Sequence, residues 1–124
     1  MNPHPADRIE LRGIRALGTH GVLPEEQKRP QPFSIDIDLV ADLRAAGQSD
    51  QLEETVDYGA VAEAVVGEVE GPSVALMERL AQRVADRVLS MAGPRATSVT
   101  VTIRKLRPPV PVHMESAGVQ VIRP

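Results

Sequence analysis

The sequence has no cysteine and no tryptophan, and Phe33 and Tyr58 are its only phenylalanine and tyrosine. Without cysteine the protein has no disulfide framework, no thiolate nucleophile and no cysteine-ligated zinc. The histidines, His4, His20 and His113, provide no clustered ligand set, so we expect no metal site. With so few aromatic side chains the core must be thin and aliphatic, which favours burial of further apolar surface between subunits.

Long apolar runs and clustered basic residues are also missing. No stretch approaches the run of about 18 apolar residues that a membrane-spanning helix needs. Asp7, Arg8 and Glu10 interrupt the segment where a signal peptide would be apolar. The net charge is −3, and the Lys and Arg residues are scattered, which argues against nucleic-acid binding. We therefore expect a soluble, cytoplasmic protein that binds neither nucleic acid nor membranes.

The chain of 124 residues contains no spacer long enough to separate two cores. We expect a flexible N-terminal lead over residues 1–6, which include Pro3 and Pro5, and a single domain over residues 7–124.

Alternation of apolar and polar residues predicts four strands. The first runs from Ile9 to Ala16 with a bulge near Gly13, and the others cover about 33–39, 99–104 and 117–122. Residues 23–32 form an exposed polar connection between the first two strands, and a loop follows residues 45–50.

Two helices are predicted between the second and third strands. Apolar residues at helical spacing indicate one helix over 58–69, with Asp57 as its N-cap. Ser73 is the expected cap of the second helix, whose apolar stripe runs from Val74 to Met91 and ends at Gly93-Pro94.

The order of these elements, ββααββ, predicts an α+β fold in which a four-stranded antiparallel sheet carries both helices on one face. The opposite face is polar and can meet bulk water or line the wet interior of a barrel that several subunits form by joining sheet edges. Periodicity alone favours neither arrangement. The residues predicted on this polar face are Ser34, Asp36, Asp38, Ser98, Thr100 and Thr102.

Five segments occur in a familiar order on these predicted elements. They are Gly18-Thr19-His20-Gly21-Val22 followed by Glu26, Ala46-Gly47-Gln48-Ser49-Asp50, Thr55-Val56-Asp57-Tyr58, Leu76-Met77-Glu78-Arg79-Leu80-Ala81, and Ile103-Arg104-Lys105-Leu106-Arg107-Pro108-Pro109. Together they span most of the chain, which resembles the dihydroneopterin aldolase family of folate biosynthesis.

The resemblance implies a tunnelling fold, in which tetrameric rings close a continuous β-barrel and two rings stack into a homo-octamer with active sites between subunits. It also implies the retro-aldol cleavage of 7,8-dihydroneopterin, a small pterin, to 6-hydroxymethyl-7,8-dihydropterin and glycolaldehyde. The C6=N5 imine of this substrate can accept the electrons released by bond cleavage. No Schiff base, metal or organic cofactor is then required.

The resemblance assigns catalytic roles to Lys105, Tyr58 and Glu26. Lys105 is the general acid/base, and Tyr58 takes part in proton transfer to the enaminol intermediate from the adjacent subunit. Glu26 binds the substrate side chain. Glu78 accepts hydrogen bonds from the 2-amino group and N3 of the pterin. The expected substrate-binding residues are Glu78, Met77, Glu26, Tyr58, Val56 and Val22.

Each of these residues also has a plainer explanation. Lys105 suits a charged strand terminus kept in water, and Tyr58 suits the edge of a core. Glu26 suits an exposed loop charge like its neighbour Glu25, and Glu78 suits the N-terminal turn of a helix. His20 is expected to be loop structure or pocket wall.

Two alternative functions remain at this point. The same residues would serve an epimerase that inverts C2′ of dihydroneopterin or its triphosphate. A non-catalytic pterin-binding or assembly module ranks lower, because the expected anchor and both proton-transfer residues are present.

Overall fold

The computed structural model describes residues 7–124, so the expected flexible lead over residues 1–6 lies outside the described residues. The strands are β1 (Arg8–Gly18), β2 (Gln31–Ala41), β3 (Ala96–Lys105) and β4 (Ala117–Arg123). The helices are α1 (Pro24–Lys28), α2 (Arg44–Ser49), α3 (Tyr58–Glu70) and α4 (Met77–Ala92), with short 3-10 turns η1 (Leu52–Glu54) and η2 (Gly93–Arg95). Within this described part of the chain, no helix is both long and apolar enough to cross a membrane.

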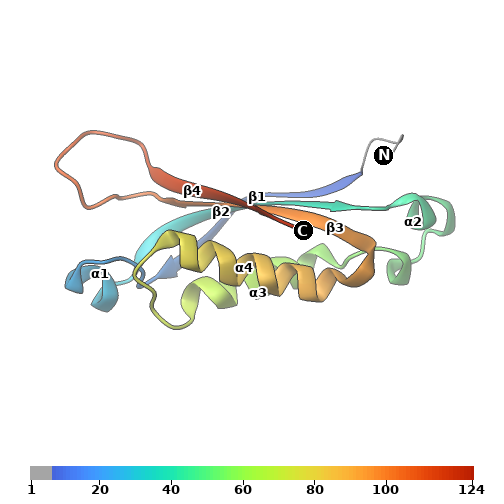
Figure 1. Cartoon of the computed structure of the whole chain (residues 1–124), viewed down its shortest axis with the longest axis horizontal. Helices are drawn as coiled ribbons and strands as arrows, with labels where there is room; N and C mark the ends of the chain where they lie inside the picture. The colour runs from blue at the N-terminus through green and yellow to red at the C-terminus, as the bar shows by residue number, and fades with distance from the viewer. Residues whose placement is uncertain (1–6) are drawn as a thin grey trace.

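The four strands form one sheet in the order β1-β2-β3-β4, and every neighbouring pair is antiparallel. Helices α3 and α4 lie side by side beneath this sheet, so the molecule has two layers (Figure 1). The arrangement confirms the predicted α+β fold of two strand pairs flanking a helical pair. Strands β1 and β4 are the outer strands, and within residues 7–124 they leave two sheet edges unpaired.

The hydrophobic core lies between the sheet and the two long helices and is almost entirely aliphatic. Phe33 is its one large aromatic side chain and is fully buried. The other core residues of the sheet and of the long helices are Ile35, Ile37, Leu39, Val61, Val65, Val69, Leu80, Ala81, Val84, Ala85, Val88, Ala92, Val99, Val101 and Ile103. Their burial follows the alternation of β2 and β3 and the helical spacing in α3 and α4.

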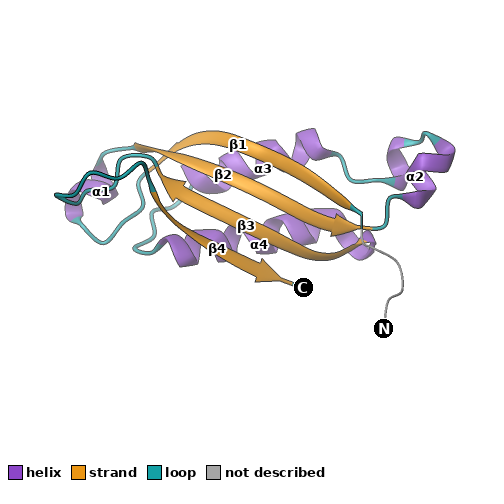
Figure 2. Ribbon diagram, turned by 90° about the horizontal axis from the view of Figure 1, so that it is seen from above, coloured by secondary structure: helices purple, strands orange, loops and turns teal. Residues whose placement is uncertain are grey.

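Figure 2 looks onto the face of the sheet that the helices leave uncovered. Strands β2 and β3 place polar residues on this face, as predicted. The register places Asp36 opposite Thr102 and Asp38 opposite Thr100 on this face. A shift in the pairing of β1 with β2 confirms the expected bulge, where Gly13 adopts φ 66°. The Gly13 N–H, released from the regular ladder, donates to the Asp36 carboxylate at 2.8 Å.

Two predicted connections contain short helices. Residues 24–28 of the expected polar connection form α1, and Glu26 there is buried rather than exposed. Residues 44–49, just before the expected loop, form α2, which ends at Asp50 in the left-handed conformation (φ 58°). Helices this short carry too few turns for an apolar period to show in the sequence.

The ends of the long helices were predicted well except at one position. The Asp57 side chain caps α3 by accepting from the Ala60 N–H at 3.2 Å. Ser73, however, does not cap α4, because Leu76 provides the first helical carbonyl, which accepts from the Leu80 N–H at 3.2 Å. The Ser73 hydroxyl instead donates to the carbonyl of Thr19.

Candidate active site

Lys105 is the last residue of β3 and continues an apolar row of the sheet. It pairs with Phe33 in the register, and it follows Ile103 and Val101 at two-residue spacing. Side chains at this spacing point to one face of a strand, so Lys105 lies on the helix-covered face, at the end of the core. Its side chain is only 11% exposed. The plainer explanation, a charged strand terminus kept in water, therefore does not apply to this lysine.

Glu26 is the partner of this lysine and is held by three donors. The Lys105 Nζ donates to Oε2 of Glu26 at 2.6 Å, and the Gln31 side-chain amide donates to the same oxygen at 3.0 Å. The Leu23 N–H donates to Oε1 at 3.4 Å. Burial alone would raise the pKa of Glu26, but these hydrogen bonds and the charge of Lys105 outweigh burial and lower the pKa. The result is an oriented ion pair with little access to water.

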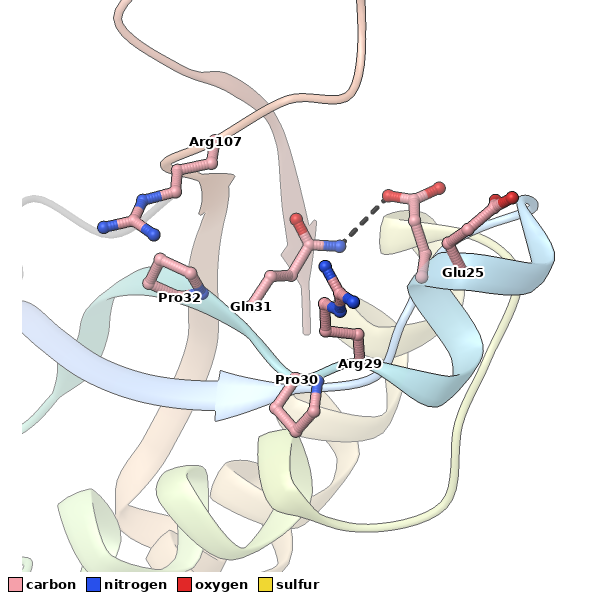
Figure 3. Close-up of a pocket in the computed structure, with 7 residues that line it drawn as sticks. Glu25, Arg29, Pro30, Gln31, Pro32 and Arg107 are labelled. Atoms are coloured by element: carbon pink, nitrogen blue, oxygen red, sulfur yellow. Dashed lines mark hydrogen bonds between the residues drawn. The ribbon is translucent and has the colours of Figure 1, made fainter.

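A pocket of about 230 Å³ opens beside the pair. Figure 3 shows that the Gln31 amide, hydrogen-bonded to the carboxylate of Glu26, lies in its wall. Small-molecule sites usually enclose about 300–1,000 Å³, so this pocket is small for a whole ligand. The lining residues are Glu25, Glu26, Arg29, Pro30, Gln31, Pro32 and Arg107.

The turn after β1 leaves room for Glu26 only because position 21 is glycine. Gly21 has φ 156°, and its N–H donates to the carbonyl of Val74 at 2.9 Å. A Cβ atom placed on Gly21 would lie 2.2 Å from the carboxyl carbon of Glu26. Any side chain here must therefore displace the carboxylate that binds Lys105.

We expect Gly21→Ala to lower kcat/KM by about 10²-fold, the usual effect of misplacing a catalytic group by about 1 Å. Steady-state kinetics with purified enzyme measures this change. Gly67→Ala is the matched control, because a Cβ there meets no atom within 4 Å and α3 gains a better helix former. Unchanged kinetics in Gly21→Ala would show that the position of Glu26 does not control the rate.

Glu78 lies at the same end of the molecule as the ion pair. It is exposed in the first turn of α4, and the preceding connection joins the turn after β1 through the hydrogen bond from Gly21 to Val74. Figure 1 shows the start of α4, helix α1 and the β3–β4 connection gathered at this end. Met77 is half-buried against the core, and Val22, 64% exposed, follows Gly21 in the turn.

Tyr58 and Val56 lie at the opposite end. Tyr58 begins α3, whereas Val69, near the end of α3, lies against His20 at the Lys105 end. At 1.5 Å per residue these two positions of the helix are roughly 16 Å apart. Tyr58 is 65% exposed, and Val56 is buried in the core. One chain therefore gathers Lys105, Glu26, Glu78, Met77 and Val22 at one end and leaves Tyr58 and Val56 at the other.

An arginine fixes the segment before Tyr58. The two terminal nitrogens of Arg95 donate to the carbonyls of Glu54 at 2.6 Å and Glu53 at 2.7 Å. This anchors η1 and hence the approach to α3. Neither Arg95 nor Gln31 was predicted as a site residue, because a lone arginine or glutamine carries no motif and its partners are distant in sequence.

Comparisons with known proteins agree with the fold. The family model for dihydroneopterin aldolase matches residues 9–122. A dihydroneopterin aldolase from Staphylococcus epidermidis is 43% identical over 94% of this chain and 96% of its own length. One from Streptomyces coelicolor is 44% identical over 94% and 97%, respectively.

A solved structure supports the same conclusion. The crystal structure of the Escherichia coli dihydroneopterin aldolase in complex with neopterin superposes with a TM-score of 0.85 at 30% identity, covering 95% of this chain and 99% of that one. The sequence match and the structural match each extend over nearly the whole chain. This chain therefore belongs to the dihydroneopterin aldolase family.

Proposed function

We propose that this aldolase cleaves the C1′–C2′ bond of 7,8-dihydroneopterin with Lys105 as the general acid/base. The observation that carries the proposal is the buried ion pair, in which the Lys105 Nζ lies 2.6 Å from the Glu26 carboxylate. A lysine at the end of a core row, with 11% of its side chain exposed, exchanges protons with a bound substrate more readily than with bulk water.

The proposed reaction needs one proton acceptor and one electron acceptor. An ammonium group has no acceptor, so Lys105 acts as the base in its neutral form, after releasing one proton. The neutral amine accepts the 2′-hydroxyl proton while C2′ becomes the aldehyde carbon of glycolaldehyde. The electron pair of the C1′–C2′ bond forms a C1′=C6 double bond, and the C6=N5 imine electrons move to N5, which takes up a proton. Protonation of C1′ and loss of the N5 proton then give 6-hydroxymethyl-7,8-dihydropterin. Glu26 orients Lys105 and contacts the substrate side chain.

Glu78 is the proposed anchor for the pterin ring. Its carboxylate is exposed in the first turn of α4, where the helix dipole favours negative charge. An ionised carboxylate accepts two adjacent N–H donors side by side, and the 2-amino group and N3 of a pterin present that pair. The main chain at Met77 and the side chain of Val22 lie at the same end of the molecule and are the proposed further contacts of the pterin ring.

Tyr58, together with the main chain at Val56, is proposed to reach the site from a neighbouring subunit. Within one chain Tyr58 is at the far end of α3, and its side chain is 65% exposed. The unpaired edges of β1 and β4 can pair between subunits, which closes the sheet into a ring and removes both edges. We place the enzyme in the cytoplasm as a homo-octamer of two stacked tetrameric rings.

Incubation of the purified enzyme with 7,8-dihydroneopterin tests the function. We expect equal amounts of glycolaldehyde and 6-hydroxymethyl-7,8-dihydropterin, with rates unchanged by EDTA because the substrate imine is the electron acceptor. Chromatography of the pterins and derivatisation of the aldehyde measure both products. Formation of only the C2′ epimer, or of no product, would contradict the proposed cleavage.

A further inference from the structure

His20 is completely buried, and both of its ring nitrogens have partners. Nε2 lies 2.6 Å from the carbonyl oxygen of Val69, and the Val74 N–H donates to Nδ1 at 3.2 Å. A backbone carbonyl can only accept, and a backbone N–H can only donate. The ring is therefore neutral with its proton on Nε2.

These contacts join two segments that are far apart in the sequence. The turn after β1 carries Thr19, His20 and Gly21, and the connection from α3 to α4 carries Ser73 and Val74. The Ser73 hydroxyl donates to the Thr19 carbonyl, and the Gly21 N–H donates to the Val74 carbonyl at 2.9 Å. We call these contacts between residues 19–21 and residues 73–74 the joint, and the imidazole of His20 lies at its centre.

The joint connects the two parts of the proposed site. The turn leads through α1 to Glu26, and the connection leads directly into α4 and Glu78. Gln31 ties the turn further to Glu26, because its amide donates both to the His20 carbonyl at 3.3 Å and to the Glu26 carboxylate at 3.0 Å. A shift at His20 is thus transmitted to both carboxylates.

The surroundings allow the ring one position. A Cβ atom on Gly18 would lie 2.7 Å from the imidazole Cδ2 and 2.7 Å from the Val69 carbonyl oxygen. On another side the ring meets Phe33 edge to face, with ring centres 5.5 Å apart. Buried rings confined in this way place their hydrogen-bonding atoms accurately.

We propose that His20 is a positioning residue for pterin binding, in which Nδ1, by accepting from Val74, holds the start of α4 and Glu78 at a fixed separation from the Glu26–Lys105 pair. The inference rests on the proposed function of Glu78 as the pterin anchor. It gives His20 a role in ligand affinity that is distinct from its contribution to stability.

Protonation of His20 would place a second N–H against the Val74 N–H and break this contact. Burial lowers the pKa of His20 from 6.5, and the positive charges of Arg83 and Lys105 lower it further, against the opposing effect of the Val69 carbonyl. Arg83 is paired with Glu68, and Lys105 with Glu26. The neutral ring therefore stabilises the joint above pH 6.5, and this contribution is lost as the pH falls through the lowered pKa.

Two substitutions of His20 test the contributions of its two ring nitrogens separately. In His20→Asn the amide oxygen can replace Nδ1 as the acceptor for Val74, and in His20→Gln the amide nitrogen can replace Nε2 as the donor to Val69. We expect His20→Gln to weaken neopterin binding by about 10-fold, the effect of leaving one buried donor without a partner, and His20→Asn to weaken it by about 3-fold or less. Fluorescence titration of the full-chain enzyme with neopterin measures both.

Equal loss of affinity in both variants, or no loss in either, would overturn the proposal. Glu78→Ala is included as a separate control. If it binds neopterin as the unsubstituted enzyme does, the proposed anchor fails, whatever the His20 variants do. Nitrogen-15 NMR of the histidine rings in the unsubstituted enzyme needs no variant to fold, and a charged His20 or a proton on Nδ1 at pH 7.5 would also overturn the proposal.

Discussion

Lys105→Ala is expected to lower kcat by about 10³-fold while the dissociation constant for neopterin changes by about 3-fold or less. In the proposed reaction the lysine accepts a proton as the C–C bond breaks, so its contribution is made in the transition state rather than in the bound ground state. Single-turnover kinetics and fluorescence titration of the same preparation separate the two effects. If only affinity falls, Lys105 is a binding residue.

Arg104→Ala is the matched control for this variant. Arg104 is the preceding residue of β3, but its side chain lies on the other face of the sheet, 45% exposed, with Asp36 at 3.4 Å. We expect kcat to stay within about 2-fold, because an exposed pair of this kind contributes little.

A second variant, Lys105→Gln, distinguishes the loss of a basic nitrogen from the loss of structural support for Glu26. Lys105→Ala leaves the buried Glu26 carboxylate without its cation, so a lower melting temperature is expected alongside the loss of rate. Lys105→Gln keeps a hydrogen-bond donor for Glu26 but has no basic nitrogen. Substantial activity in Lys105→Gln would show that the lysine only supports Glu26.

Much of the fold was predictable because its main signals are local. Strand β2 alternates without interruption, and α3 has both an apolar helical period and a capping Asp57. The misplaced start of α4 has a clear cause, since Ser73 is a good capping residue by type but its hydroxyl is used by Thr19. Local preference gave way to a contact between segments 54 residues apart.

The site was less predictable because its contacts join distant residues. Glu26 and Lys105 are separated by 79 positions, and neither stands out among the charged residues of the chain without the family resemblance. In the structure Lys105 continues the alternation of Val101 and Ile103, but its sequence neighbours do not show that Glu26 of α1 would meet it there. His20 could not be assigned for the same reason, since its partners Val69 and Val74 follow it by 49 and 54 positions.

The separation of Tyr58 from Lys105 gives the most direct test of assembly. We expect Tyr58→Phe to lower kcat by about 10²-fold through loss of a proton-transfer group. When Tyr58→Phe and Lys105→Ala subunits are unfolded together and refolded at equal concentration, about a quarter of the unsubstituted activity should return, because each shared site draws at random on two subunits. The initial rate with 7,8-dihydroneopterin measures this recovery.

Glu26→Ala mixed with Lys105→Ala is the control that makes the test specific. These two residues form their ion pair within one chain, at 2.6 Å, so no assortment of whole subunits can place both in the same site. This mixture should stay as inactive as either variant alone. Recovery in the control would reveal contaminating activity, whereas failure of the Tyr58→Phe and Lys105→Ala mixture, with refolded rings of normal mass, would require Tyr58 to act far from Lys105. If each active site is shared between two subunits, a mixture of two variants should recover activity only when the two substituted residues come from opposite ends of the sheet.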